Sequence, residues 1–537
     1  MPKELSFGTD ARKKMMVGVD AVAKLVGSTL GPKGRCVVVE RIVTNPATKE
    51  VVGLSPVTTK DGVSVARAIS LPDPTENLGC DLIREAALRT VSEAGDGTTA
   101  SIVLAHSLIS NGMEAIENGA SPVFLRSGID RTVAQVVKLI SEMSIPSEGR
   151  EAQIANIAAN GDQEIGSTVV EAVKMAGKHG IVSVDSSRTS QTHIEFSKGM
   201  RFDSGLRYPD FITNGEHNEC VLENPYILLH ERRITDIGKV ADLLGLVAKE
   251  GRSILILSEE FEIPVAGFLI ANLTKLRSCP VVAPWFGERR REFLKDLAIF
   301  TKGVSITDEL GLDLKKAGIE ILGSAERVVV TKNHTTIVGG KGDKVEIARR
   351  VESVKQSLKN TENSYECEVL ADRLAKLDGG VAVIKIGAAT ESESKEKRDR
   401  TEDAVLSVKC SQEEGVVPGG GITLLRCSEN SALINFVGSL NHEEQIGAHL
   451  VMKALTAPFF RILENGGYKP NEIQCLIENS GMKGFNALTG EVVDMMVEGI
   501  VDPAKVVRQA ITNAASLAGT MLTTSGTIVN LREGVSK

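Results

Sequence analysis

Glycines beside a carboxylate form the strongest chemical signal in the chain, because this combination can bind a phosphate together with a metal ion. The segment Ala94-Gly95-Asp96-Gly97-Thr98-Thr99 precedes a helical apolar pattern over residues 102–108. Glycines let the backbone approach a phosphate closely, and the N-terminus of the following helix attracts an anion. The Asp96 carboxylate suits a hard cation such as Mg²⁺. On its own, the segment is also explained by a helix cap after a tight turn.

Two earlier segments add basic and acidic side chains. Residues 29–35, with the sequence TLGPKGR, end one helical pattern and precede an apolar strand at 37–39. They are not a Walker A loop, because GxxxxGK[ST] occurs nowhere in the chain, and alone they are typical of a helix C-cap and turn. In Thr59-Lys60-Asp61-Gly62 the lysine suits phosphate charge and the aspartate suits a metal ion or water, although a turn explains this segment alone.

The third acidic element is Glu402-Asp403, which lies in a helical pattern over residues 393–414. A carboxylate on a helix is normally a solvated surface charge. Asp403 becomes catalytic only if folding brings it to Asp61 and Asp96, where it would deprotonate a water that attacks a γ-phosphate. A further glycine cluster at 417–421, VPGGG, then opens another helical segment and suits close approach by a nucleotide.

The segments that must position these residues show two kinds of apolar pattern. Helix-period apolar residues occupy 11–35 and 78–142, and long helical patterns return from about 415 to 524. Between about 199 and 378, short apolar runs alternate with helical patterns, which predicts α/β structure. We therefore expect the first and last segments to fold together, with the middle segment inserted between them.

Glycines near the crossings between these segments are candidate hinges, because glycine absorbs large φ/ψ changes at low cost. They are Gly199, Gly379, Gly380 and Gly415. An ordinary turn explains each of them singly.

Composition excludes several other classes of protein. The 537 residues carry a formal charge of −8 without a basic block, and aromatic residues make up only 4%, which argues against a nucleic-acid or anionic-membrane binder. The eight cysteines include no CxxC pair, which argues against a zinc cage or a disulfide framework. No window reaches the ~18 apolar residues that span a bilayer, and the start has no signal core. We expect a cytoplasmic protein, in a bacterial cytosol or, for a virus-encoded chain, in a host cytosol.

The order of these motifs along the chain resembles that of a known protein family. Segments 29–34, 60–62, 95–99, 387–391, 402–403, 413–421, 486–487 and 499–503 follow one another as they do in group I chaperonins. The chain resembles a divergent member of this GroEL family from residue 4 to about 524. The resemblance implies a multidomain α/β chaperonin fold, with a mostly helical equatorial ATP-binding domain, a small intermediate hinge domain and an inserted α/β apical domain. The implied ranges are 1–142 and 415–537 for the equatorial domain, 143–198 and 379–414 for the intermediate domain, and 199–378 for the apical domain.

The resemblance also implies an activity and a site. It implies an ATPase that uses ATP and Mg²⁺, with K⁺ as a further expected ion, to drive protein folding inside a ring chamber. Asp61 and Asp403 would position the hydrolytic water, and Asp96 would hold Mg²⁺. The implied nucleotide-binding residues are Thr29, Leu30, Gly31, Pro32, Lys60, Asp96, Gly97, Thr98, Thr99, Gly420, Asn486, Ala487 and Asp502.

The implied partners are other copies of the chain, in a heptameric single or double ring, and unfolded client proteins. A GroES-like co-chaperonin is a further candidate, and neither nucleic acid nor a membrane is expected. Clients would bind an apolar groove of the apical domain, since hydrophobic attraction is not sequence-specific. The matching positions are Leu206, Phe211, Leu243, Leu244, Val265, Leu269 and Ile270. Ordinary core packing explains each of these residues taken singly.

Four features depart from the family pattern. Residues 40–59 form a longer hairpin, and the tail 531–537 lacks the Gly-Gly-Met repeat. Ser204 replaces an arginine that the family pairs with the acid at Glu391, and Asp210 makes the client groove more polar. Phe460 and Lys469 replace an oppositely charged pair at the contact between rings. We therefore expect ring–ring association to be weakened or rearranged.

Two other classes of function are alternatives to an active chaperonin. A small-molecule kinase would need an acceptor site, and no such motif accompanies the hydrolytic carboxylates. A structural ring that has lost turnover would not need Asp61, Asp96 and Asp403 together.

Overall fold

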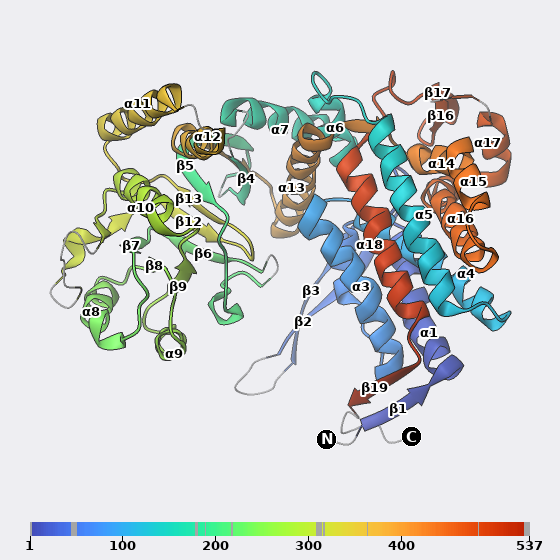
Figure 1. Cartoon of the computed structure of the whole chain (residues 1–537), viewed down its shortest axis with the longest axis horizontal. Coiled ribbons are helices and arrows are strands. Elements are labelled where there is room, and N and C mark those ends of the chain that lie inside the picture. The colour runs from blue at the N-terminus through green and yellow to red at the C-terminus, as the bar shows by residue number, and fades with distance from the viewer. Residues whose placement is uncertain are drawn as a thin grey trace. The chain divides into compact units, whose positions relative to one another are not determined.

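The structure, a computed structural model, describes residues 3–44, 51–177, 181–187, 189–215, 218–307, 314, 317–361, 364–478, 480–481 and 483–530. The chain divides into two compact units. Unit 1 contains residues 1–170, 186–192 and 386–537, and unit 2 contains residues 171–185 and 193–385. The predicted insertion of a middle segment between a first and a last segment that fold together is therefore confirmed (Figure 1).

Unit 1 is built mainly from long amphipathic helices. Its helices are α1 (Gly8–Gly27), α2 (Gly62–Ala68), α3 (Pro74–Ala94), α4 (Thr98–Glu117), α5 (Pro122–Met143), α6 (Glu151–Ala158), α13 (Glu391–Glu414), α14 (Ile422–Glu429), α15 (Ser431–Gly438), α16 (His442–Asn465), α17 (Pro470–Ile477) and α18 (Ala504–Leu522). Helix α7 (Gln163–Ala176) begins in unit 1 and ends in unit 2. In α1 the residues Met15, Val19, Val22 and Val26 are buried at the 3-4 spacing of one helix face, so the apolar pattern of the sequence is the pattern of the core.

Short antiparallel strand pairs tie distant parts of unit 1 together. Strand β1 (Lys3–Phe7) pairs with β19 (Gly526–Asn530), and β2 (Val37–Thr44) pairs with β3 (Val51–Thr59). Strand β15 (Val416–Pro418) pairs with β18 (Val501–Pro503), and β16 (Lys483–Asn486) pairs with β17 (Glu491–Asp494). The β15–β18 pair matters for the site, since it sets Val417 opposite Asp502.

Glycines let the long helices of unit 1 approach one another closely. A Cβ on Gly128 of α5 would lie 2.1 Å from the carbonyl oxygen of Glu444 in α16, and a Cβ on Gly447 of α16 would lie 2.3 Å from the carbonyl oxygen of Leu125 in α5. The same helices are joined by Glu444, which accepts hydrogen bonds of 2.6 Å from Ser127 Oγ and Arg131 Nη1. The α5–α16 contact therefore depends on residues without side chains at the crossing.

Unit 2 contains two sheets with helices packed against them. Its strands are β4 (Ile181–Ser186), β5 (His193–Phe202), β6 (Cys220–Glu223), β7 (Tyr226–His230), β8 (Ile254–Ser258), β9 (Ser278–Val282), β10 (Ser305–Ile306), β11 (Gly323–Ser324), β12 (Arg327–Val330), β13 (Thr335–Val338) and β14 (Gly380–Ile386). Its helices are α8 (Ala241–Lys249), α9 (Ile263–Ala271), α10 (Gly287–Thr301), α11 (Lys344–Asn360) and α12 (Ser364–Asp378). The predicted α/β character of this segment is confirmed.

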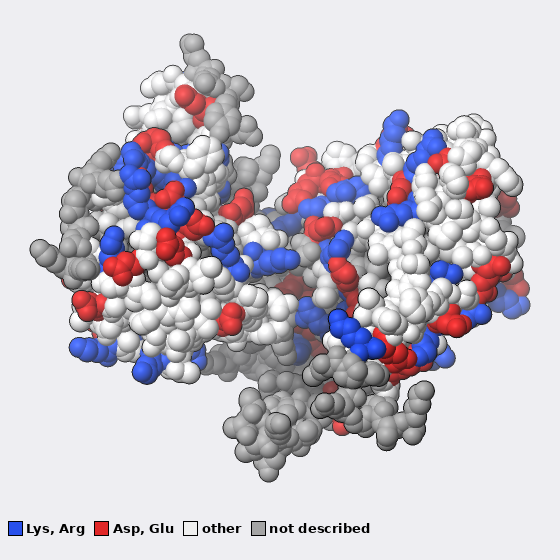
Figure 2. All heavy atoms as spheres, turned by 60° about the horizontal axis from the view of Figure 1, so that its bottom comes forward, with Lys and Arg blue, Asp and Glu red and all other residues white. Residues whose placement is uncertain are grey.

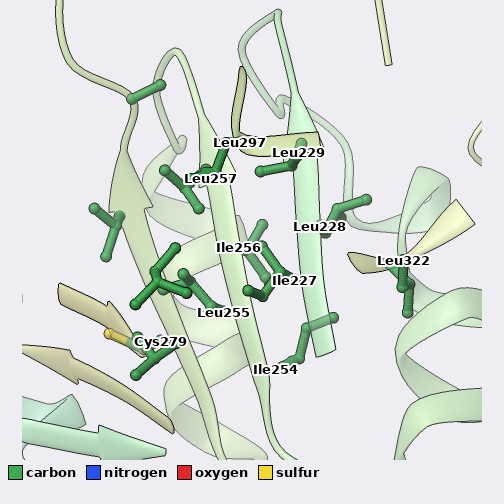
Figure 3. Packing of buried hydrophobic residues seen from close by; sticks show 14 of the residues in the cluster. Ile227, Leu228, Leu229, Ile254, Leu255, Ile256, Leu257, Cys279, Leu297 and Leu322 are labelled. Atoms are coloured by element: carbon green, nitrogen blue, oxygen red, sulfur yellow. The ribbon is translucent and has the colours of Figure 1, made fainter. Parts of the chain in front are cut away.

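The parallel strands form the centre of unit 2. One sheet has the order β10-β7-β8-β9 with β11 added antiparallel to β7, and the other has the order β4-β14-β5-β13-β12-β6. Every residue of β8 is buried, as expected for a parallel strand that is covered on both faces. Figure 3 shows Ile227, Leu228, Ile256 and Leu257 of β7 and β8 packed in this core, with Leu297 of α10 beside them.

Two predicted features fall wholly or partly outside the described residues. The tail 531–537 lies outside them, as do residues 45–50 of the longer hairpin. The predicted three-domain division stays a prediction, because the expected intermediate segments are shared between the two units.

Helix α16 is long and apolar enough to cross a membrane by length and composition alone. Half of its most apolar window is buried inside the protein, and Val451, Ala454 and Leu455 belong to the core of unit 1. A core helix passes the same test, so this helix is weak evidence for a membrane span. Charged side chains of both signs are mixed over the surface that Figure 2 shows.

The two residues that depart from the family pattern at the expected ring contact lie at the end of α16 and after it. Phe460 is partly buried and its ring centroid lies 6.2 Å from that of Phe459. Lys469 is exposed and its Nζ lies 2.7 Å from Glu472 Oε1 in the same chain. The number of rings stays a prediction.

Substitution of Gly128 by alanine tests the close α5–α16 contact. We expect Gly128→Ala to lower the free energy of unfolding by ~1–3 kcal/mol, because the added methyl group overlaps backbone that cannot rotate away. Gly438→Ala is the matched control, since a Cβ there meets nothing within 4 Å. Chemical denaturation of both variants measures the difference, and equal stability of the two would contradict this account of the contact.

Candidate functional site

The loop after α1 and the start of α4 lie against each other in unit 1. Thr29 Oγ1 donates to the Val26 carbonyl oxygen at 2.8 Å and lies 3.5 Å from Thr99 Oγ1. Gly31 has a φ of +85°, a left-handed conformation that glycine adopts without strain. The loop is held from behind by Asn465, whose Nδ2 donates to the carbonyl oxygens of Gly27 and Leu30 at 2.9 Å. Leu30 is half-buried and Pro32 is exposed.

Asp61 follows β3 and caps α2. Its two carboxylate oxygens accept hydrogen bonds from the backbone N–H groups of Val63 at 3.1 Å and Ser64 at 2.8 Å. The next residue, Gly62, packs so tightly that a Cβ would lie 2.4 Å from Thr99 Oγ1. Asp61 is therefore both a helix cap and a neighbour of the 94–99 loop, and the half-buried Lys60 precedes it.

The 94–99 loop joins α3 to α4 through two left-handed glycines, Gly95 with φ +69° and Gly97 with φ +85°. The cap explanation is wrong for Asp96, because the N-cap residue of α4 is Gly97 and no side chain caps this helix. Instead, Asp96 Oδ1 accepts a hydrogen bond from the Gly97 N–H at 2.5 Å. The first N–H groups of a 20-residue helix are thus left for an anion, close to Thr98 and Thr99.

Helix α13 brings Asp403 to this loop from the far end of the chain. Ser407, one helical turn after Asp403, donates from Oγ to Asp96 Oδ2 at 3.0 Å. Cys410 Sγ donates to the Ala94 carbonyl oxygen at 3.2 Å. Asp403 lies on the same face of the helix, since residues four apart in a helix share a face.

The pKa of Asp403 is raised in part by the charges of nearby aspartates, so these side chains lie close together. Burial, followed by the charges of Asp96, Asp61 and Asp399, raises the pKa of Asp403 well above its usual value. Burial raises the pKa of Asp96 as well, while the hydrogen bonds from Gly97 and Ser407 act in the opposite direction. The three aspartates that the sequence places far apart therefore converge in one site.

Asp502 joins the site from β18. Burial and the charge of Asp96 raise its pKa to about 7, while a hydrogen bond from the Gly420 N–H opposes the rise. Space beside it is tight, because a Cβ on Gly419 would lie 3.0 Å from Asp502 Oδ1. Gly420 itself has a φ of +65°, and a Cβ there would lie 3.1 Å from the Met495 methyl group.

Asn486 and Ala487 lie at the turn between β16 and β17. Asn486 Oδ1 accepts hydrogen bonds from the N–H groups of Leu488 and Thr489, and Ala487 is buried. Met495 contacts this hairpin near Gly484 and also lies beside Gly420, so the hairpin is part of the same neighbourhood. The predicted nucleotide residues are therefore all in unit 1, but their contacts with a nucleotide stay a prediction.

Two further residues, Asp399 and Ser407, belong to this neighbourhood and were not predicted from the sequence. Asp399 lies one helical turn before Asp403, and burial, then the charges of Asp61 and Glu402, raise its pKa to about 7. Ser407 lies one turn after Asp403 and is buried. The signal was the spacing 399-403-407, which places all three on one face of a helix already singled out for Asp403.

The donor set fits Mg²⁺ in part. Asp96 offers hard carboxylate oxygens, which Mg²⁺ prefers, and Mg²⁺ commonly takes one or two carboxylates and completes its shell with water and phosphate. Among the residues that the structure describes, no group of three or more His, Cys, Asp or Glu side chains is arranged to hold a metal ion without such help. A cation here would accordingly depend on a phosphate as well as on Asp96.

The predicted client residues are mostly part of the core of unit 2. Phe211, Leu243, Leu244, Val265 and Leu269 are at most 3% exposed, and Leu206 and Ile270 are partly buried. These five side chains cannot contact a client in this structure, because the apolar faces of α8 and α9 pack inward. Ordinary core packing, which the sequence left open for each of them, describes these five residues here, and their role in client binding stays a prediction. The exposed apolar side chains nearby are Leu246, Ile263 and Phe286, of which the last two are more than 80% exposed.

The candidate hinge glycines have local structural explanations. A Cβ on Gly199 would lie 1.9 Å from Val381 Cγ2, and one on Gly380 would lie 2.3 Å from the Phe196 ring. Gly415 ends α13 with a φ of +78°. Gly379 directly precedes β14. Their role as hinges stays a prediction.

Ser204, the position of the lost arginine, is used within unit 2. Its Oγ donates to the Val282 carbonyl oxygen at 2.5 Å, and its own carbonyl oxygen accepts from Thr335 Oγ1 at 2.6 Å. Asp210 lies exposed in a single 3-10 turn.

Comparison with known proteins gives two kinds of match. Residues 22–532 match the model of the TCP-1/cpn60 chaperonin family. Among solved structures, the chaperonin gp146 of bacteriophage EL 2 (Pseudomonas aeruginosa), crystallised in the presence of ATP-BeFx, matches in two crystal forms. Form II gives a TM-score of 0.69 at 23% identity, and form I gives 0.61 at 22%. Each match covers 98% of this chain and 99% of the phage chain, so the fold is shared over its whole length.

The raised pKa of Asp399 predicts how stability depends on pH. A carboxyl that binds its proton more tightly in the folded chain costs stability as pH rises above its unfolded pKa, and the cost levels off above its folded pKa of about 7. The melting temperature of the nucleotide-free protein should therefore fall between about pH 4 and pH 7. Asp399→Asn should weaken that fall, by about 1 °C for each kcal/mol recovered in a chain of this length.

Thermal unfolding at several pH values measures this effect. Asp10→Asn, which changes an exposed aspartate of α1, is the control and should leave the slope unchanged. An Asp399→Asn slope identical to that of the wild type would show that this carboxyl is not held against its ionised form.

Proposed function

The chain belongs to the TCP-1/cpn60 chaperonin family, and from this premise we propose that it is an ATP-driven chaperonin. It captures non-native proteins on apolar surface of unit 2 and promotes their folding inside a ring of identical chains. Binding and hydrolysis of Mg-ATP in unit 1 drive the cycle. The phage chaperonin with the same fold was crystallised with ATP-BeFx, which supports a nucleotide as the ligand.

One observation carries the proposal, namely the convergence of Asp61, Asp96 and Asp403 in unit 1. A structural protein gains nothing from this arrangement, because buried like charges disfavour one another and cost stability. Phosphoryl transfer does use such a set, since it needs carboxylates to hold a cation and to orient the attacking water. Charge repulsion that is relieved by a bound cation is expected at a functional site.

The phosphates would lie at the N-terminus of α4. Its N–H groups have no side-chain cap, and the helix dipole favours negative charge there. The flanking glycines remove side chains from the surface that a phosphate would approach, and Lys60 adds a positive charge beside it. Asn486 and Ala487, on the β16–β17 hairpin, would face the nucleobase of the bound nucleotide.

Asp96 would hold Mg²⁺, which when bound neutralises phosphate charge. Asp403 has to be ionised to accept a proton from the attacking water, and the charges of Asp96 and Asp61 oppose that ionisation. Compensation of those charges lowers the pKa of Asp403, so the base becomes competent only in the loaded site. Asp61, fixed by its two N–H donors, would orient the same water.

Clients would bind the apolar side chains that unit 2 leaves exposed. Ile263 begins α9, and Phe286 directly precedes α10. Both are more than 80% exposed, so their apolar surface is open to an unfolded chain. The ring, its heptameric order and a GroES-like co-chaperonin belong to the same proposal.

Removal of the proposed base tests the chemistry. We expect Asp403→Ala to bind ATP with nearly unchanged affinity while steady-state hydrolysis falls ~10²-fold or more, the usual effect of losing a general base. Glu413→Gln is the control on the same helix, because Glu413 is exposed and pairs with Lys505 at 2.6 Å. Phosphate release by both variants is the measurement. Wild-type turnover in Asp403→Ala would remove this residue from the mechanism.

Substitution of the exposed apolar residues tests the client surface. Ile263→Asp and Phe286→Asp should each weaken capture of a chemically denatured client by about tenfold, since each removes one buried apolar contact from the complex. Ile434→Asp changes an exposed apolar residue of unit 1 and should capture clients normally. Circular dichroism checks that all three variants are folded. Undiminished capture by both variants of unit 2 would place the client surface elsewhere.

A further inference from the structure

Ser407 is a buried hydroxyl whose hydrogen bond is aimed at the carboxylate that would hold Mg²⁺. The residue is 1% exposed, and its Oγ donates to Asp96 Oδ2 at 3.0 Å. A serine in the middle of a helix ordinarily bonds to its own backbone or to water. Here the hydroxyl joins two segments that are 311 residues apart in the sequence.

The Asp96 carboxylate is oriented by two donors of different origin. Its Oδ1 accepts from the Gly97 N–H, which belongs to the same loop, and its Oδ2 accepts from Ser407, which belongs to α13. Each carboxylate oxygen has more than one acceptor site, so both hydrogen bonds leave room for a cation. Only the second bond depends on where α13 lies.

Two neighbours of Ser407 fix α13 against the same loop. A Cβ on Gly95 would lie 2.4 Å from the Leu406 Cβ, so this leucine rests directly on the loop backbone. Cys410 Sγ donates to the Ala94 carbonyl oxygen at 3.2 Å. Consecutive loop residues 94, 95 and 96 therefore contact one face of α13, and the proposed base Asp403 precedes this contact by one turn.

We propose that Ser407 is a positioning residue that orients Asp96 for Mg²⁺, and that it thereby makes cation affinity depend on the docking of the helix that carries Asp403. This inference rests on the proposed function, because it assigns a role in the Mg-nucleotide site. Hydrogen bonds to a ligating carboxylate fix its orientation, and their loss typically costs 10–100-fold in metal affinity.

The coupling works in both directions. If docked α13 raises the affinity of Asp96 for the cation, the bound cation must favour docked α13 by the same factor. Asp403 then reaches the attacking water when α13 is docked, which is also the state in which Asp96 holds the cation. Cation binding and hydrolysis therefore both depend on the hydrogen bond between Ser407 and Asp96.

The experiment measures nucleotide affinity as a function of free Mg²⁺ in the full-length protein. The probe is methylanthraniloyl-ADP, a fluorescent nucleotide with no γ-phosphate to hydrolyse. Wild type is compared with Ser407→Ala and with Ser411→Ala, a matched control whose hydroxyl donates only to the Val408 carbonyl oxygen at 2.6 Å. Affinity in the presence of EDTA gives the cation-free reference for each variant.

We expect Ser407→Ala to need 10–100-fold more free Mg²⁺ for half-maximal tightening of nucleotide binding, with cation-free affinity unchanged. Ser411→Ala should follow the wild type. Equal Mg²⁺ dependence in Ser407→Ala and wild type would overturn the proposal. Equal weakening with and without Mg²⁺ would also overturn it, because that result indicates a structural role in packing α13.

Hydrogen exchange measures the reciprocal effect, namely stabilisation of docked α13 by Mg²⁺. This measurement requires neither ATP hydrolysis nor a fluorescent nucleotide. With ADP present, Mg²⁺ should slow hydrogen exchange of α13 amides in the wild type, and this protection should shrink in Ser407→Ala. Protection that is unchanged in the variant contradicts the coupling. Failure of the proposed function would look different, since the wild type itself would then bind no nucleotide under any condition.

Discussion

Mutual repulsion between half-buried carboxylates is the constraint on which the candidate site of unit 1 depends. Asp61, Asp96, Asp403 and Asp502 come from four separate segments, and the charge of one raises the proton affinity of another. Such a cluster is unfavourable in a folded chain unless protons or cations compensate it. The long helices and their close glycine contacts supply the stability that offsets this cost.

The same constraint links chemistry to conformation. The Asp61 carboxylate is held by N–H groups of its own helix, and Asp96 is held partly by its own loop, so both are present whatever α13 does. Asp403 reaches the site on α13, and the contact of this helix with residues 94–96 is one of those that hold it there. In the proposed ATP-driven cycle, a base that arrives on a separate helix would let nucleotide binding precede hydrolysis.

Unit 2 shows why an apolar pattern does not identify a binding surface. The residues Leu243, Leu244 and Val265 match a family groove, yet they fill the core beneath α8 and α9. Hydrophobic residues enter a core and a capture surface for the same reason, namely removal from water. Periodicity gives the apolar face of each helix, but whether that face is covered depends on the sheet beneath it. The side chains that remain exposed, such as Ile263 and Phe286, lie at the starts of helices, where a helical pattern carries no information.

The sequence by itself determined the helical and α/β segments, the insertion of one within the other, and the identity of the acidic residues, because periodicity and motif order are properties of the chain. It also contained the 399-403-407 spacing, although nothing in that spacing says which face of the helix meets a partner. Only the tertiary structure decided that Asp96 is not a helix cap, that Asp399 and Ser407 join the site, and that most expected client residues are buried. Ser407 joins the site through a contact with a residue 311 positions away, and the burial of the client residues depends on the sheet beneath their helices. Such contacts exist only once the elements have packed.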